Sequence, residues 1–200
     1  MTGTMHRVTA SAAVLAAVLL SGCASEAPIV RPSVSVPSVP HTPSGAATLV
    51  PEGWTPFADT SGDPSLRMAL RSADGTALIA LREFIVTESA DSSLRRSGPC
   101  AAAQLSARLR LASERGRVRL TRAPAPLNGM METCYFVTDA DGLLVRVAVF
   151  RKNGSYFELE ARQHTADAAM DTLARVQSDM LLRMQRAEPD RFRSLLSTAP

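Results

Sequence analysis

Three cysteines are the residues of this 200-residue chain that could do covalent chemistry: Cys23, Cys100 and Cys134. A thiolate can attack a substrate when a histidine serves as its base, or join a second thiol in a disulfide, or carry an attached group. Of the three histidines, only His164 lies in the part of the chain expected to form strands and helices. The sequence contains no G-x-S-x-G, H-E-x-x-H, C-x-x-C, G-x-G-x-x-G or P-loop motif. We therefore expect no enzyme activity, no catalytic residue, no cofactor and no metal site.

Residues 1–22 have the layout of a secretory signal peptide. A basic start at Arg7 precedes an apolar run of about 13 residues that ends in small residues. The run is too short for a transmembrane helix, which needs about 20 apolar residues. Its last residues and Cys23, Leu-Ser-Gly-Cys, resemble the lipobox of bacterial lipoproteins. The resemblance implies that Cys23 receives a lipid with acyl chains such as palmitate and becomes the first residue of the mature protein. A plain secreted protein and an uncleaved anchor are the alternatives.

The lipobox also implies a location in the cell envelope. The protein would be lipid-anchored to a membrane on its extracytoplasmic side, and the outer membrane is favoured if the cell has two membranes. Once Cys23 is assigned to the lipid, Cys100 and Cys134 remain as a pair in an oxidising compartment, where a disulfide is the default state. The alternative is a hydrolase in which one of these two thiols attacks with His164 as the base.

The charge of the chain argues against one class of partner. A formal net charge of +3 is too weak to indicate nucleic-acid binding, which the expected location also disfavours. Eight arginines nevertheless lie between Arg95 and Arg122, against Glu114 alone. Such a region could contact anionic lipid headgroups or cell-wall polymers. A solvated helix face is the alternative, because the whole chain is biased to arginine and has the single lysine Lys152.

The chain divides into four parts. Residues 1–22 are the signal peptide, and 23–48 are the lipidated cysteine with a Pro-rich linker. An extended linker of this kind rises about 3.1 Å per residue and could reach about 75 Å. Residues 49–185 are expected to form one domain, and 186–200 a short C-terminal tail.

Apolar periodicity and turn residues predict the elements of the domain. A hairpin is expected at Asp74-Gly75, then a polar loop over 87–98. The other expected elements are a helix over 99–115, a short strand over 117–121 that ends before Pro124, strands over 132–138, 143–151 and 155–162, and a helix over 166–184.

Two registers are open for the hairpin around Asn153-Gly154. A two-residue loop would put Glu158 and Glu160 on one face with Val149 and Val147. A three-residue loop would instead put Phe157, Leu159 and Ala161 opposite the valines, and we expect this second register. With a three-residue loop over 140–142 as well, Cys134 would share a face with Phe136, Ala148 and Phe150. Cys100, on the first turn of its helix, could then join that helix to the sheet.

The order of these elements, with the opening Val50-Pro-Glu-Gly-Trp54 and the strand Tyr156-Phe-Glu-Leu-Glu-Ala161 before the last helix, resembles the PsbP-like family. That family includes the photosystem subunit PsbP and bacterial lipoproteins of the LpqN and DcrB type. The resemblance covers about residues 49–185. It implies an α+β fold in which an antiparallel β-sheet is covered by helices, as an α/β/α sandwich, and a role as a binding or accessory module.

We therefore expect a non-enzymatic lipoprotein that binds or supports another envelope component, which could be a protein, a cell-wall polymer or a lipid. The alternative is a carrier of a small apolar ligand or lipid. Its pocket would lie between the sheet and helix 166–184, lined by residues such as Met170 and Leu173.

Overall fold

The computed structural model describes residues 29–30, 49–57, 62–130 and 132–197. The predicted signal peptide and Cys23 lie outside the described residues. The strands are β1 (Ile29–Val30), β2 (Trp54–Pro56), β3 (Leu66–Ser72), β4 (Ala77–Val86), β5 (Val118–Pro126), β6 (Cys134–Ala140), β7 (Leu143–Lys152) and β8 (Ser155–Gln163). The helices are α1 (Glu88–Arg96), α2 (Ala101–Ser113), α3 (Met170–Arg186) and α4 (Pro189–Ser197).

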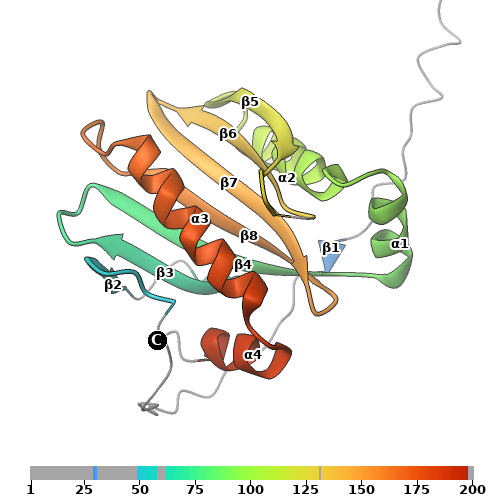
Figure 1. The fold of residues 1–200 in the computed structure, drawn as a ribbon. Coiled ribbons are helices and arrows are strands. Elements are labelled where there is room, and N and C mark those ends of the chain that lie inside the picture. Colours follow the sequence, from blue (N-terminus) through green and yellow to red (C-terminus); the bar gives the residue numbers. More distant parts are fainter. Residues whose placement is uncertain (1–28, 31–48, 58–61, 131, 198–200) are drawn as a thin grey trace, which may run out of the picture.

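These elements form one antiparallel sheet with helices on both faces (Figure 1). The strand order is β2-β3-β4-β8-β7-β6-β5, and β1 pairs with the end of β4, where Ile29 lies opposite Val86. The expected α+β fold, an antiparallel sheet covered by helices, is therefore confirmed. β1 falls inside the segment 23–48 that the sequence indicates is a linker, and the remainder of that segment lies outside the described residues.

The helix α3 crosses one face of the sheet and buries most of its apolar stripe there. Leu173, Met180, Leu181 and Met184 are all buried against the central strands. The fully buried Gln177 donates to the backbone carbonyls of β7 and β8, at 3.0 and 2.6 Å, and so fixes the helix to the sheet. The helix begins four residues after the expected start at 166.

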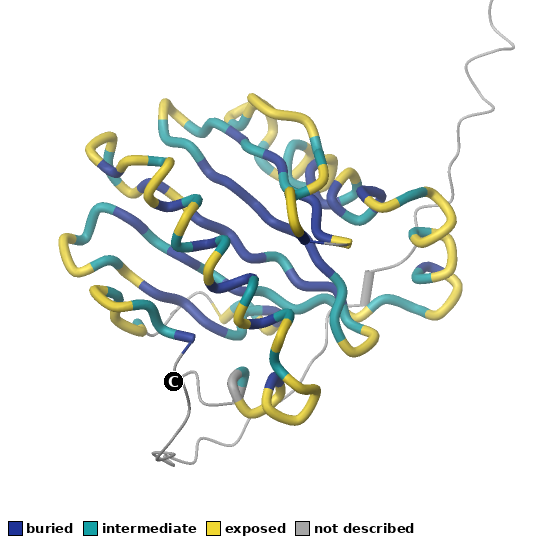
Figure 2. Tube along the Cα trace, viewed as in Figure 1, coloured by how far each residue is buried: buried dark blue, intermediate teal, exposed yellow. Residues whose placement is uncertain are grey.

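The short helix α4 completes this side of the core. Its Phe192 is buried edge-on against Phe157, with 5.2 Å between ring centroids, and Phe157 stacks on Phe150 at 5.3 Å. Buried residues are concentrated in the central strands and on the inner sides of the helices (Figure 2).

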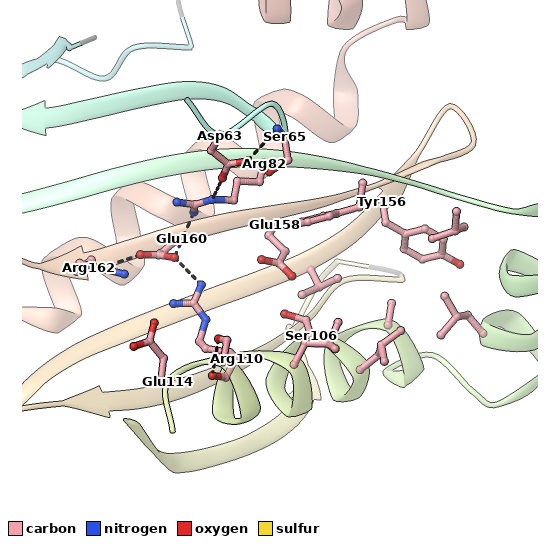
Figure 3. A pocket seen from close by; sticks show the side chains of 18 residues that line it. Asp63, Ser65, Arg82, Ser106, Arg110, Glu114, Tyr156, Glu158, Glu160 and Arg162 are labelled. Atoms are coloured by element: carbon pink, nitrogen blue, oxygen red, sulfur yellow. Dashed lines mark hydrogen bonds and ion pairs between the residues drawn. The ribbon is translucent and has the colours of Figure 1, made fainter. Parts of the chain in front are cut away.

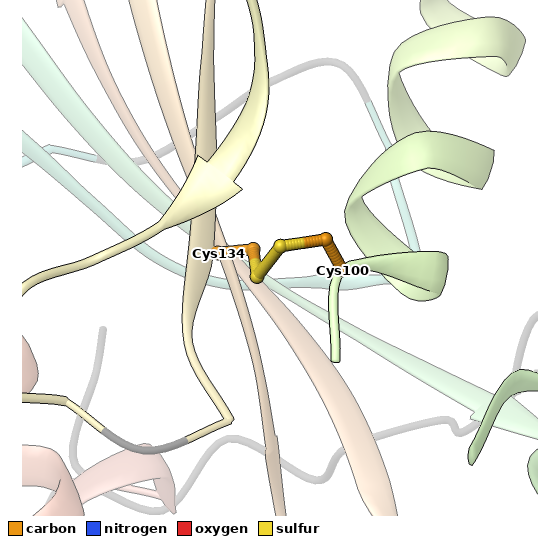
Figure 4. Close-up of a disulfide and its surroundings, with 2 residues drawn as sticks. All are labelled: Cys100 and Cys134. Atoms are coloured by element: carbon orange, nitrogen blue, oxygen red, sulfur yellow. A yellow bond between two sulfur atoms is a disulfide. The ribbon is translucent and has the colours of Figure 1, made fainter. Parts of the chain in front are cut away.

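The helix α2 covers the opposite face over β5, β6 and β7. Ala103 and Ala107 pack on Phe136 and Val147 in a second, smaller core. The disulfide between Cys100 and Cys134 joins the start of α2 to the start of β6, with 5.4 Å between the two Cα atoms (Figure 4). The disulfide expected from the sequence is thus formed.

Residues 87–98, expected to be a loop, contain the helix α1. The Thr87 hydroxyl caps its N-terminus by accepting from the Ala90 N–H at 3.3 Å. Acidic residues in the first turn and Arg95 and Arg96 in the last complement the helix dipole. The helix has a single buried residue, Ala90, so its sequence lacks the apolar stripe by which a helix is usually predicted.

The strand β5 continues through Pro124 and Pro126, where the sequence was expected to break. A proline is tolerated on an edge strand because its missing N–H can lie on the unpaired side. β5 is such an edge strand, and its pairing with β6 shifts register between Leu120 and Arg122 and again before Ala125.

The expected register of the β7–β8 hairpin is wrong. Lys152 pairs with Ser155, so the loop is the two residues Asn153 and Gly154, with φ of 51° and 84°. Positive φ at both positions defines the type I′ turn that Asn-Gly favours. In this register Glu158 lies opposite Val149 and Glu160 opposite Val147, on the face that α2 covers.

The β6–β7 hairpin differs in the same way, because its loop is Asp141-Gly142 alone. Cys134 does share a face with Phe136, as expected. The residues opposite these two are Val149 and Val147, rather than Ala148 and Phe150.

We predict that the disulfide contributes about 3–4 kcal/mol to the free energy of unfolding, because it closes a loop of 34 residues in the unfolded chain. Urea denaturation of a Cys100→Ser/Cys134→Ser variant should show this loss against the oxidised protein. A reductant added to the parent protein should cause the same loss in the free energy of unfolding. It should not change the free energy of unfolding of the double variant. An unfolding midpoint that does not respond to reductant would contradict the prediction.

Candidate functional site

A cavity of about 420 Å³ lies between α2 and the strands β4, β8 and β7 (Figure 3). The pairing of β4 with β8 sets the order of side chains along it. Arg82 pairs with Glu158, and two residues further along Phe84 pairs with Tyr156. Val86 then ends β4 on the same face. The cavity therefore has a charged end around Glu160 and an apolar end around Val86.

Three arginines converge on the buried carboxylate of Glu160 at the charged end. Arg110 Nη2 from α2 lies 2.5 Å from one oxygen, and Arg82 Nη1 from β4 lies 3.3 Å from the same oxygen. Arg162 Nε from β8 lies 2.8 Å from the other oxygen. Only 5% of the Glu160 side chain is exposed. Glu160 thus joins the helix to two strands.

The arginines decide the charge of Glu160. Burial alone would raise the pKa of its carboxyl, but the attraction of Arg110, Arg162 and Arg82 outweighs burial and lowers the pKa to about 2. For Arg110, burial lowers the pKa and Glu160 raises it, and the net direction is upward. Arg82 also contacts Asp63, with 3.1 Å between Nε and Oδ2. Glu160 and Arg110 are therefore both charged at neutral pH.

Glu158 lies two residues away on the same strand and has a different environment. It is half-buried, and burial raises the pKa of its carboxyl. The Ser106 hydroxyl of α2 and the positive charges of Arg110 and Arg82 oppose the shift in part. Arg82, its cross-strand neighbour, is directed to Asp63 and Glu160 instead. Among the described residues, no arginine or lysine forms an ion pair with Glu158.

The apolar end is closed by α1, which is tied down through Asp91. The Tyr156 hydroxyl donates to Asp91 Oδ1 at 2.8 Å, and Arg151 donates to both carboxylate oxygens at 3.0 and 2.9 Å. Burial, followed by the bond to Asp91, raises the pKa of Tyr156 to about 12. These contacts hold Leu94 of α1 at the wall of the cavity.

The structure does not bring together the thiol and the histidine that the alternative hydrolase would need. Cys100 and Cys134 are bonded to each other, so neither is a free nucleophile. His164 is exposed and directly follows the last residue of β8. In the sheet, Glu158 of β8 lies level with Cys134 of β6. His164 is six residues further along, which is about 20 Å in an extended strand. The Cys–His hydrolase alternative is therefore wrong for the oxidised protein.

The pocket expected under helix 166–184 is also misplaced. The described residues at that interface, among them Leu173 and Met180, pack closely in the main core, and the cavity lies on the opposite face. The arginines between Arg95 and Arg122 are spread over α1, α2, β5 and the connection between α2 and β5 rather than gathered on one helix face. One of them, Arg110, enters the cavity.

Sequence reasoning missed Glu158, Glu160 and Arg82 as site residues. The signal that could have found them was the Asn153-Gly154 dipeptide, since the two-residue loop it favours turns both glutamates toward α2.

In the described part of the chain, no group of three or more His, Cys, Asp or Glu could hold a metal ion. No helix within these ranges is long and apolar enough to cross a membrane.

The structure is similar to two solved structures. One is the solution structure of cyanobacterial PsbP (CyanoP) from Synechocystis sp. PCC 6803, with a TM-score of 0.48, 13% identity, and coverage of 66% of this chain and 81% of that one. The other is LpqN, involved in cell envelope biogenesis of Mycobacterium tuberculosis, with a TM-score of 0.34, 14% identity, and coverage of 64% and 75%. No family model and no curated protein matches the chain. The likeness concerns the arrangement of the chain alone.

We predict that Glu160→Gln lowers the free energy of unfolding by about 3 kcal/mol at pH 7, since the pKa falls from 4.5 to about 2 on folding. A carboxyl whose pKa is lower in the folded state stabilises the fold above its unfolded pKa. The deficit of the variant should therefore shrink as the pH falls from about 4.5 to 2. Urea denaturation across this range measures it, with Glu52→Gln, an exposed carboxyl outside the cavity, as the control.

Glu158→Gln should have the opposite effect on stability. A carboxyl whose pKa is raised by burial costs free energy when it ionises, so its removal should leave the fold as stable as the parent, or more stable, at pH 7 to 8. Parallel denaturation of the two glutamine variants makes the comparison. Equal losses at both positions would show that the two carboxyls are in equivalent environments.

Proposed function

We propose that the chain is a lipid-anchored binding module of the cell envelope, and that its binding site is the cavity between α2 and the sheet. The anchor is supported by the signal-peptide layout of residues 1–22 and the lipobox-like ending at Cys23. The site is supported by the cavity itself, because α2 is fixed at one end by the disulfide and further along by Arg110 on Glu160.

The observation that carries the proposal is the division of the cavity into a charged and an apolar end. Binding sites for small molecules combine an apolar lining with a few placed polar groups that orient the ligand, and usually measure about 300–1,000 Å³. This cavity has that size, and its polar groups are held by neighbours before any ligand arrives. A site of this kind can bind without reorganising its charges.

The geometry favours binding over catalysis. Two carboxyls with opposite pKa shifts in one cavity can form an acid–base pair in enzymes. Here the acceptor oxygens of Glu160 are occupied by Arg82, Arg110 and Arg162, which makes Glu160 a poor proton acceptor. We therefore propose a non-enzymatic role in which the module presents or carries what it binds.

The anchor can be tested by labelling. Cells that express the protein and are fed labelled palmitate should incorporate the label into the parent protein, and Cys23→Ser should abolish incorporation. Cys100→Ser is the matched control, because it also removes one thiol but leaves the lipobox intact, and it should keep the label. Label retained in Cys23→Ser would rule out Cys23 as the lipid site.

The cavity can be tested with Nile red, a neutral dye whose fluorescence rises in apolar sites. Ala102→Phe places a large side chain on a wall of the cavity and should weaken dye binding by about tenfold. Gln104→Phe adds the same ring to an exposed position of α2 that does not line the cavity, and should not weaken it. Unchanged binding by both variants would place the binding site elsewhere.

A further inference from the structure

The charged side chains that line the cavity are not all paired with one another. Four acidic and three basic side chains reach it: Asp63, Glu114, Glu158 and Glu160, with Arg82, Arg110 and Arg162. All three arginines contact Glu160, and Arg82 also contacts Asp63. Glu114 pairs with Arg117 outside the cavity, at 3.5 Å. Among the described residues, each arginine of the cavity is therefore held in an ion pair, and one carboxyl, Glu158, forms no ion pair, although the charges of Arg110 and Arg82 lie near enough to attract it.

The surroundings of Glu158 suit a cation. Its neighbours along the face are the cross-strand pair Phe84 and Tyr156, whose side chains line the cavity. A cationic group between a carboxylate and an aromatic ring gains from both the ion pair and the cation–π attraction. The Ser106 hydroxyl, which donates to Glu158, keeps lone pairs that can accept from an ammonium N–H.

The cavity beyond these rings is apolar. Val86 from β4, Leu94 from α1, and Ala102 and Leu105 from α2 form its walls. An alkyl chain that runs from Glu158 past the aromatic pair would be surrounded by these side chains. Each buried CH₂ group contributes about 0.8 kcal/mol, so a chain of several carbons would add substantially to the affinity.

We infer that the cavity takes an amphiphile with a cationic ammonium head, held at Glu158 beside Tyr156 and Phe84, and an alkyl chain that fills the apolar end. This inference rests on the proposed function, since it assumes that the cavity is the binding site. An ammonium head would favour the ionised form of Glu158, which burial alone disfavours, whereas an anionic amphiphile would meet this side chain with every arginine of the cavity already in an ion pair.

Three probes with the same chain and different heads test the inference: hexylammonium chloride, sodium hexanoate and 1-hexanol. Calorimetric titration into the lipidated protein, held in phosphatidylcholine nanodiscs, gives each affinity after subtraction of empty nanodiscs. Hexylammonium should bind at least about tenfold more tightly than hexanoate or hexanol, as a charge-assisted hydrogen bond and ion pair predict. Glu158→Gln should remove this preference and leave hexanol binding unchanged.

Two further variants test whether the preference for hexylammonium depends on the cavity carboxyl and on the aromatic ring. Glu52→Gln removes an exposed carboxylate outside the cavity and should not change the preference. Phe84→Leu keeps the cavity apolar but removes one ring, and should weaken hexylammonium more than hexanol.

The outcomes separate the inference from the proposed function. Equal binding of the three probes, or a preference for hexanoate, with no effect of Glu158→Gln, would overturn the cationic ligand while the cavity remained the site. The absence of binding by any probe, or binding that Ala102→Phe leaves intact, would overturn the cavity as the site as well.

Discussion

The two-residue turn at Asn153 and Gly154 determines which helix each side chain of β8 meets. Side chains alternate along a strand, so a shift of one residue would exchange the two faces. With this turn, Phe157 and Leu159 face α3 and join the main core, while Glu158 and Glu160 face α2. The protein therefore buries carboxyl groups on the α2 side of the sheet and most of its large apolar side chains on the α3 side, where the buried Arg146 and Gln177 bond to each other.

The consequence for α2 is that it cannot pack on the sheet along its whole length. Its first turns rest on a small core of alanines, valines and the disulfide. Further along, Arg110 reaches across to Glu160 and fixes the helix by an ion pair in place of apolar contact. The helix contacts mainly β5, β6 and β7, so the cavity lies on its other side, toward β4 and β8, and Arg110 reaches Glu160 across it. The disulfide and the arginines thus position the walls of one site.

Much of the fold follows from local sequence signals, and the site does not. The apolar stripe of α3, the Asp74-Gly75 hairpin and the Cys100–Cys134 pairing each depend on residues close in sequence or on a simple count of cysteines. The site depends on which face of β8 is buried under which helix, and apolar patterning favoured the wrong register there. It paired valine with phenylalanine and leucine, whereas the structure pairs Val147 and Val149 with glutamates. Arg110 of α2 and Arg82 of β4 compensate Glu160, and neither partner is apparent without the tertiary structure.

The pairing of β1 with β4 would limit how far the domain could stand from a membrane if the proposed lipid on Cys23 anchored it. Residue steps of about 3.3–3.6 Å allow no more than about 22 Å between Cys23 and Ile29, where β1 begins. With a lipid on Cys23, the edge strand β1 would lie within that distance of the bilayer. Val86, which pairs with Ile29, also lines the apolar end of the cavity. With that lipid, the apolar end of the cavity would also lie near the bilayer.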